Sequence, residues 1–257
     1  MRAGLLAIAL AVAPHTAFAR SPVEACLAVD QRLTDPAPLP RTSTILTGAG
    51  PLRVVAIGSS STLGLWQSDA TRTYPGRLKA ELQQLRPGLS VELINSGRNA
   101  DTIPGNIARF ARDVAAHKPD LVIWQIGTND ITWLHSADSL TGRITDGIRQ
   151  LKATGADVIL MDQQYAPVIL ASNYTKMQES IIEAARHENV PLFSRFNLMR
   201  RTVEGGVSVT ALTSWDGLHS SADGYECVGR ALAHAIVATM PAAVQTQPTP
   251  AKRVRSK

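Results

Sequence analysis

The sequence predicts an α/β protein built on a parallel β-sheet, and two observations predict it. Five short, nearly continuous apolar runs recur along the chain, as in strands that are covered on both faces. Segments in which apolar residues repeat with helical periodicity separate these runs. Strands and helices that alternate in this way form a parallel sheet with right-handed crossover connections.

The five predicted strands are short and rich in branched apolar side chains. They are LRVVAIG (52–58), SVELINSG (90–97), DLVIWQIG (120–127), ADVILMD (156–162) and VPLFSRF (190–196). Helices are predicted at 73–85, 106–117, 140–155 and 173–189, with a last helix at about 223–239. In the first of them Leu78, Leu82 and Leu85 form one stripe, which predicts the face that packs on the sheet.

The composition is that of a globular protein, and its excess positive charge lies at the two ends. Charged residues make up 18% of the 257 residues and hydrophobic residues 44%. The net charge is +5, but Arg2 and four basic residues within 252–257 account for all of it. The body of the protein is therefore neutral, and it has no basic face for nucleic acid.

The first 19 residues have the three-part layout of a secretory signal peptide. One arginine precedes an apolar run, a polar break follows, and Ala17-Phe18-Ala19 predicts cleavage after Ala19. The run is too short to span a bilayer, so no membrane segment is expected after cleavage. A buried first helix is the alternative. Export to the periplasm or the medium is the prediction.

The rest of the chain divides by composition. Residues 20–50 are rich in proline and threonine and are predicted to be an extended lead-in. Residues 51–240 hold the predicted domain, and the basic tail 241–257 has no apolar pattern, which predicts disorder. Cys26 and Cys227, the two cysteines, can form a disulfide in an exported chain, and two buried thiols are the alternative.

Polar motifs follow the predicted strands or precede the last helix. They are GSSST (58–62), NSGRNADT (95–102), GTND (127–130) and WDGLHSSADGY (215–225). Ligands of an open parallel sheet bind at the carboxyl ends of its strands, so these segments are expected to meet at one edge.

Together these motifs contain the parts of a serine hydrolase. A serine hydroxyl such as that of Ser60 needs a base, and His219 can serve if a carboxylate orients its ring. Asp216 lies three residues before His219, close enough to do so in a tight loop. Asn129 can donate its amide to a developing oxyanion, and the loop at 95–102 can donate backbone N–H groups. Each motif alone also fits a polar turn or a helix cap, so the conjunction carries the inference.

The order of these motifs resembles that of the SGNH hydrolase superfamily, also called GDSL hydrolases, over about residues 53–238. The resemblance implies a three-layer α/β/α sandwich with a flavodoxin-like sheet of order 2-1-3-4-5. It also implies ester hydrolysis through an acyl-enzyme. Ser60 would be the nucleophile, His219 the base, Asp216 its partner and Asn129 the side-chain oxyanion donor.

Two positions depart from the family pattern. Ser59 stands where the family has the aspartate before the nucleophile, and Ala100 stands at the second glycine of the second motif. The family uses the backbone N–H of that second position, together with that of the nucleophile. Alanine has the N–H but lacks the freedom of glycine for positive φ. Ala100 is therefore the expected backbone donor beside Ser60, with Gly97 as a fallback.

Four aromatic residues follow or precede the catalytic segments: Trp66, Trp133, Tyr165 and Trp215. They can line an acyl or sugar pocket, or they can pack the edge of the sheet.

The sequence thus predicts an exported serine esterase for short-chain acyl esters, including O-acetylated carbohydrate as a candidate substrate. A lysophospholipase or acyl thioesterase of the same fold, a glycan-binding relative without activity and a flavin carrier are the alternatives. No Cys/His cluster indicates a metal, and no cofactor is expected. The pattern predicts no oligomeric state.

Overall fold

The structure is a computed structural model that describes residues 20–30, 32–34, 38–48, 50–132 and 140–240. The predicted signal peptide (1–19), Trp133 and the predicted tail (241–257) lie outside these residues. No helix of the described residues is long and apolar enough to cross a bilayer.

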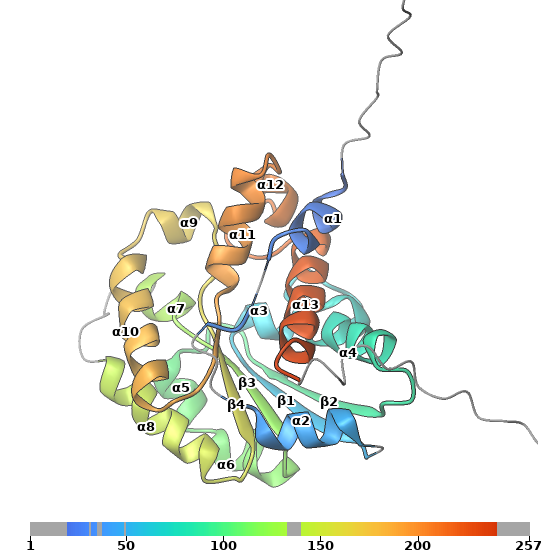
Figure 1. The fold of residues 1–257 in the computed structure, drawn as a ribbon. Coiled ribbons are helices and arrows are strands. Elements are labelled where there is room, and N and C mark those ends of the chain that lie inside the picture. Colours follow the sequence, from blue (N-terminus) through green and yellow to red (C-terminus); the bar gives the residue numbers. More distant parts are fainter. Residues whose placement is uncertain (1–19, 31, 35–37, 49, 133–139, 241–257) are drawn as a thin grey trace, which may run out of the picture.

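A single parallel sheet forms the centre of the molecule (Figure 1). Its strands are β1 (Leu52–Gly58), β2 (Val91–Gly97), β3 (Leu121–Gln125), β4 (Asp157–Met161) and β5 (Leu192–Phe193). The order is β2-β1-β3-β4-β5, which confirms the predicted flavodoxin-like arrangement. β5 is shorter than the predicted strand 190–196 because the Ser194 side chain accepts a hydrogen bond from the Asn197 N–H and starts a helix there.

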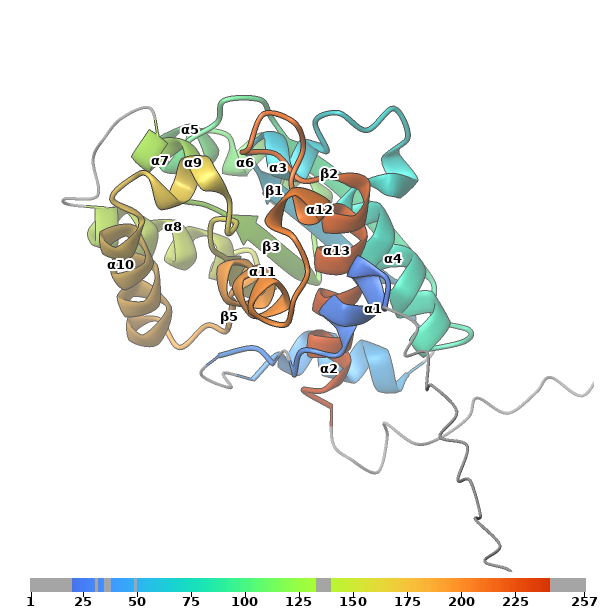
Figure 2. The ribbon, with the colours of Figure 1, turned by 90° about the horizontal axis from the view of Figure 1, so that it is seen from above.

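Helices cover both faces of the sheet. They are α1 (Pro22–Leu27), α2 (Pro40–Thr47), α3 (Ser60–Leu63), α4 (Tyr74–Leu85), α5 (Ile103–Ile107), α6 (Phe110–Asp113), α7 (Thr128–Thr132), α8 (Leu140–Lys152), α9 (Pro167–Leu170), α10 (Tyr174–His187), α11 (Arg195–Glu204), α12 (Val209–Leu212) and α13 (Ala222–Val237). Two 3₁₀ turns, Ala70–Arg72 and Ala115–His117, complete the elements. Figure 2 shows α4 and α13 on one side of the strands and α8 and α10 on the other.

The apolar runs of the strands divide between two hydrophobic cores, since successive side chains of a strand point to opposite faces. In β1, Val54 and Ala56 pack into the core under α4 and α13, whereas Val55 and Ile57 pack into the core under α8 and α10. Burial on both faces explains why the strands show continuous apolar runs rather than alternation.

The predicted extended lead-in is wrong in part, because residues 20–50 contain α1 and α2. Ser21 and Glu24 form a capping box around α1, and a proline occupies the first helical turn of both helices. This start signal was present in the sequence. The structure joins Cys26 of α1 to Cys227 of α13 by a disulfide, with their Cα atoms 5.8 Å apart.

Candidate active site

Ser60 lies where β1 turns into α3, at the carboxyl edge of the sheet. Its side chain is largely buried, with 6% of the residue exposed. The turn is tight: a Cβ at Gly58 would collide with the side chains of Thr62 and Gln125. The strand end therefore needs glycine so that the turn carrying Ser60 can pack against β3.

The side chain of Gln125, the last residue of β3, binds this turn. Its Oε1 accepts hydrogen bonds from the Ser59 N–H (3.0 Å), the Ser59 hydroxyl (2.9 Å) and the Thr62 hydroxyl (3.1 Å). All three residues are buried. The serine that replaces the family's aspartate is thus satisfied by a neutral acceptor from the neighbouring strand.

His219 and Asp216 come from the loop between α12 and α13, and they complete a continuous hydrogen-bonded chain. Ser60 Oγ lies 2.8 Å from His219 Nε2, and His219 Nδ1 lies 2.6 Å from Asp216 Oδ2. Asp216 Oδ1 accepts the backbone N–H of Leu218 (3.0 Å) and of His219 (2.9 Å). The three side chains are therefore in the arrangement that general-base activation of a serine requires.

The environment of Asp216 keeps it ionised. Burial raises the pKa of this carboxyl, but the hydrogen bond from the His219 ring, those from two backbone N–H groups and one from the Trp66 indole lower it more. The net pKa lies well below the ordinary value of 3.8. A carboxylate next to His219 stabilises the imidazolium that forms when the ring takes a proton.

The loop after β2 brings Ala100 to the same edge. Gly97 pairs with Gly58 in the sheet, and Arg98 N–H donates to the Gly58 carbonyl (3.1 Å). Ala100 adopts a left-handed backbone conformation, with φ at 58°. This conformation costs a residue with a Cβ atom about 1–2 kcal/mol of folding free energy. The fold nevertheless holds Ala100 in it.

Two backbone N–H groups stay open at this edge. Among the described residues, no acceptor is bonded to the backbone N–H of Ser60 or of Ala100. The N–H of Gly97, the fallback donor, differs from these two because it donates to Asn95 Oδ1 at 2.9 Å.

Buried Arg109 fixes the loop that follows Ala100. Its guanidinium lies 2.6 Å from Asp101 Oδ2 and donates to the carbonyls of Ser96 (2.7 Å) and Gly58 (3.1 Å). The predicted helix 106–117 breaks at this arginine into α5, α6 and a 3₁₀ turn. The break accompanies the burial of the guanidinium against the active-site loop.

Asn129 lies in α7, directly after β3, and is only 3% exposed. Its Nδ2 donates to the Asp101 carbonyl at 2.8 Å, which fixes the amide next to the Ala100 loop. Among the described residues, no acceptor is bonded to the second hydrogen of this amide, which can therefore donate to a ligand. The adjacent Asp130 accepts the Ile103 N–H at 3.0 Å, and burial raises the pKa of this carboxyl.

The predicted aromatic residues separate into two groups. Trp66 and Trp215 are exposed, at 54% and 83%, and their ring centroids lie 5.6 Å apart beside the His219 loop. Tyr165 is partly buried and packs edge-on against Phe196 of α11, with ring centroids 5.2 Å apart. Trp133 is outside the described residues.

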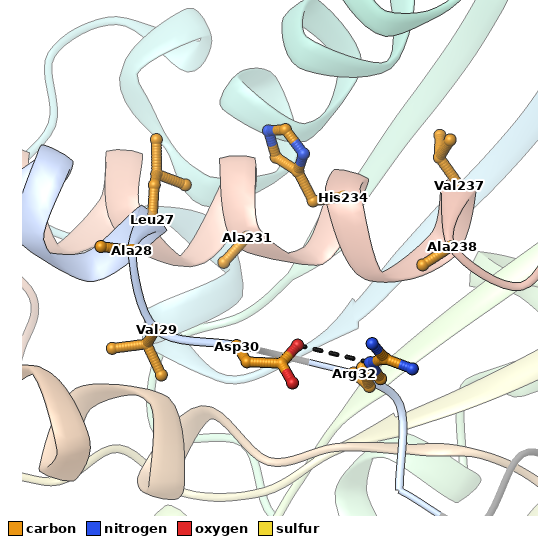
Figure 3. A pocket seen from close by; sticks show the side chains of 9 residues that line it. All are labelled: Leu27, Ala28, Val29, Asp30, Arg32, Ala231, His234, Val237 and Ala238. Atoms are coloured by element: carbon orange, nitrogen blue, oxygen red, sulfur yellow. Dashed lines mark hydrogen bonds and ion pairs between the residues drawn. The ribbon is translucent and has the colours of Figure 1, made fainter. Parts of the chain in front are cut away.

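Other features of the molecule lie away from this site. A groove of about 520 Å³ between the chain after α1 and the end of α13 contains Val29, Asp30 and His234 among its lining residues (Figure 3). Neither Ser60, His219 nor Asp216 lines this groove. In the part of the chain that the structure describes, no three His, Cys, Asp or Glu residues gather as metal ligands.

A family model described as the non-GDSL lipase-like family matches residues 25–242 of the chain. The chain belongs to this family. The resemblance to the SGNH hydrolase superfamily is confirmed.

Two relatives of this chain carry the names of esterases. It is 26% identical over 186 residues to an arylesterase of Vibrio mimicus, covering 72% of the chain and 88% of the relative. It is 24% identical over 203 residues to an acetylxylan esterase of Geobacillus stearothermophilus, covering 72% of the chain and 87% of the relative. The protein is a carboxylic ester hydrolase of the SGNH type.

Solved structures show the same fold. A two-domain esterase active on acetylated mannans matches with a TM-score of 0.67 at 20% identity, over 83% of this chain and 55% of that one. The chain thus spans about half of that larger enzyme. The acetylxylan esterase from Geobacillus stearothermophilus matches with a TM-score of 0.62 at 22% identity, over 74% of this chain and 95% of that one.

The sequence interpretation missed the residues that support the site. Gln125 and Gln164 are both 1% exposed, and Arg109 is 6% exposed. Gln164 Oε1 accepts the Thr128 hydroxyl (3.0 Å) and its Nε2 donates to the Leu218 carbonyl (2.8 Å), so it links the segments of Asn129 and His219. For the two glutamines the available signal was a polar residue inside or just after an apolar strand, as in LVIWQIG, whereas Arg109 lies in a predicted helix.

Proposed function

We propose that this family member is an exported serine esterase in which Ser60 forms the acyl-enzyme. The proposal rests on one observation above all, the chain of hydrogen bonds from Ser60 through His219 to Asp216. His219 Nε2 removes the Ser60 proton as Oγ attacks the ester carbonyl carbon, and the proton then passes to the leaving alcohol. Water, deprotonated by the same ring, attacks the acyl carbon and releases the acid and free Ser60.

The oxyanion of each tetrahedral intermediate would be bound by the backbone N–H groups of Ser60 and Ala100 and by the Asn129 amide. The support is that both backbone N–H groups lack a described acceptor and that the Asp101 carbonyl fixes the amide beside them. Such donors stabilise charge that develops only in the transition state, so they raise kcat.

The proposed substrate is a short-chain acyl ester of a carbohydrate. The supporting observations are the exposed Trp66 and Trp215 rings beside the site and the relatives named for acetylxylan and acetylated mannans. Aromatic rings of this kind offer a large apolar contact area to a ligand with little loss of side-chain freedom. Lysophospholipids and acyl thioesters are the substrates against which this proposal is tested.

Residues 1–19 would direct export and then be removed, and the Cys26–Cys227 disulfide supports an oxidising compartment. N-terminal sequencing of the protein from the periplasm or the medium should begin at Arg20. A mature protein that retains Met1 would contradict export by this route.

The nucleophile is tested by labelling with a fluorophosphonate probe. The wild type should be labelled stoichiometrically, with the label on Ser60, and Ser60→Ala should lose both labelling and hydrolysis of p-nitrophenyl acetate. Ser61→Ala is the matched control, because Ser61 is the next residue and is also buried. Labelling that survives in Ser60→Ala would remove Ser60 from the nucleophile role.

The substrate is tested with p-nitrophenyl esters of rising chain length, an acetylated xylo-oligosaccharide and an acyl thioester. The highest kcat/KM should fall on acetyl esters and on the acetylated sugar. A preference for long acyl chains or for the thioester would overturn the proposed substrate class while leaving the serine mechanism intact.

A further inference from the structure

We propose that Trp66 is a positioning residue that holds the Asp216 carboxylate, and through it the His219 ring, against the loop of the nucleophile. The inference rests on the proposed serine mechanism, in which Asp216 orients His219. It adds a fourth side chain to the hydrogen-bonded chain of Ser60, His219 and Asp216.

The contacts of Asp216 carry the inference. Its Oδ2 receives both the His219 ring (2.6 Å) and the Trp66 indole N–H (3.0 Å), while Oδ1 receives two backbone N–H groups. A carboxylate has about four lone-pair positions, so this one is fully used. Three of the four donors belong to residues 218 and 219 of its own loop. Within the described residues, Trp66 is the only donor to Asp216 from another part of the chain.

Trp66 therefore joins the two halves of the site. Its loop follows α3 directly, and Leu65 N–H donates to the Ser60 carbonyl at 3.1 Å. The Leu65 carbonyl in turn accepts the Tyr225 hydroxyl of α13 at 3.1 Å. The indole thus extends from a segment bound to the nucleophile turn to a carboxylate 150 positions later.

The backbone of Trp66 is held in a conformation that a bulky residue rarely adopts. Its φ is 70°, in the left-handed region that favours glycine. Such a residue persists only when surrounding contacts hold it, and here the conformation brings an indole N–H to Asp216. The ring lies edge-on to His219 with centroids 6.5 Å apart, and it packs against Trp215. Consequently the Asp216 side chain is only 19% exposed in a surface loop.

The test is Trp66→Phe, which keeps an aromatic ring and removes the N–H donor. With p-nitrophenyl acetate, kcat should fall about tenfold, the effect of losing one hydrogen bond to a charged group, while KM stays within about twofold. Trp66 is half exposed, so the variant should fold. Its thermal midpoint is measured to establish this. Trp66→Leu, which also lacks the donor, should show the same loss of kcat and replaces Trp66→Phe if that variant is unstable.

A double-mutant cycle with Asp216→Asn separates positioning from a general structural role. If Trp66 acts through the carboxylate, Trp66→Phe should change kcat by less than about twofold in the Asp216→Asn background. The same tenfold loss in both backgrounds, or an unchanged kcat in the single variant, would overturn the inference. Fluorophosphonate labelling of the wild type is run in parallel, because a wild type that is not labelled contradicts the proposed function rather than the role of Trp66.

Discussion

The turn of the proposed nucleophile Ser60 (58–63, here the nucleophile turn) and the His219 loop (213–221) are joined by the hydrogen bond between Ser60 and His219, but the chain anchors them differently. The nucleophile turn is held from the interior, by Gln125 of β3 and by the buried guanidinium of Arg109, which bonds the Gly58 carbonyl. In the His219 loop, the Leu218 carbonyl accepts a hydrogen bond from buried Gln164. The Asp216 carboxylate, by contrast, is held mostly within the loop, since it accepts N–H groups from residues two and three positions later. Its contact with Trp66 lies at the surface.

Because of this difference, substitutions in the two regions should affect folding free energy and activity differently. A buried polar network costs folding free energy when one partner is removed, because the remaining groups stay buried without hydrogen bonds. A local loop motif near the surface can lose its orienting group and leave the fold intact. Variants on the nucleophile side should therefore lose stability and activity together, and variants of Asp216 should lose much activity with only a small loss of stability.

The largest expected effect belongs to Asp216→Asn. The amide keeps the size of the side chain but removes the charge and disfavours the ring tautomer that accepts the Ser60 proton, so kcat should fall about 10⁴-fold. The free energy of unfolding at neutral pH should change by less than about 1 kcal/mol, within the range of substitutions near the surface. Steady-state kinetics and urea unfolding of the same preparation measure both quantities. A loss of stability as large as the loss of activity would break the comparison.

A smaller effect, but on both quantities, is expected for Gln125→Leu. The substitution leaves the Ser59 N–H and the hydroxyls of Ser59 and Thr62 buried without their acceptor. Unfolding free energy should fall by about 1–3 kcal/mol. The rate of Ser60 labelling by a fluorophosphonate should fall with it. Normal labelling in a destabilised variant would show that the turn keeps its geometry without Gln125.

The smallest effect concerns pH and Asp216 again. Its pKa in the folded protein is below the ordinary 3.8, so it contributes stability that is present above that value and is lost as the pH falls through and below it. Between about pH 5 and about pH 3, unfolding free energy should therefore fall more steeply in the wild type than in Asp216→Asn. Urea unfolding at both pH values measures this. Parallel decreases would show that the carboxylate is not stabilised by its hydrogen bonds.

Much of the architecture could be predicted because short sequence patterns determine the strands, and the parallel sheet then brings their ends together. Apolar runs of branched residues appear as strands wherever both faces are covered, and the polar motifs that follow them meet because parallel strands end at one edge. The Ser60 and His219 segments, 159 positions apart, were predicted to meet for this reason. The Asp216 contact was predictable from a spacing of three residues.

The supporting residues could not be predicted in the same way, because their roles depend on partners that are distant in sequence. Gln125 reads as a polar residue near the end of a strand, and only the packing of β1 on β3 gives it three donors. In the sequence, Trp66 is a candidate pocket residue. Only the folded structure shows that its indole N–H reaches Asp216 of the His219 loop. Helix α1 is different, because its capping box of Ser21 and Glu24 is a local signal that the sequence contains.

The disulfide has a consequence for how the molecule survives damage. Its two cysteines are 201 positions apart and enclose all of the proposed catalytic residues. A single protease cut anywhere between them would produce two fragments that stay covalently joined. The nicked chain would separate only after a reductant opens the bond.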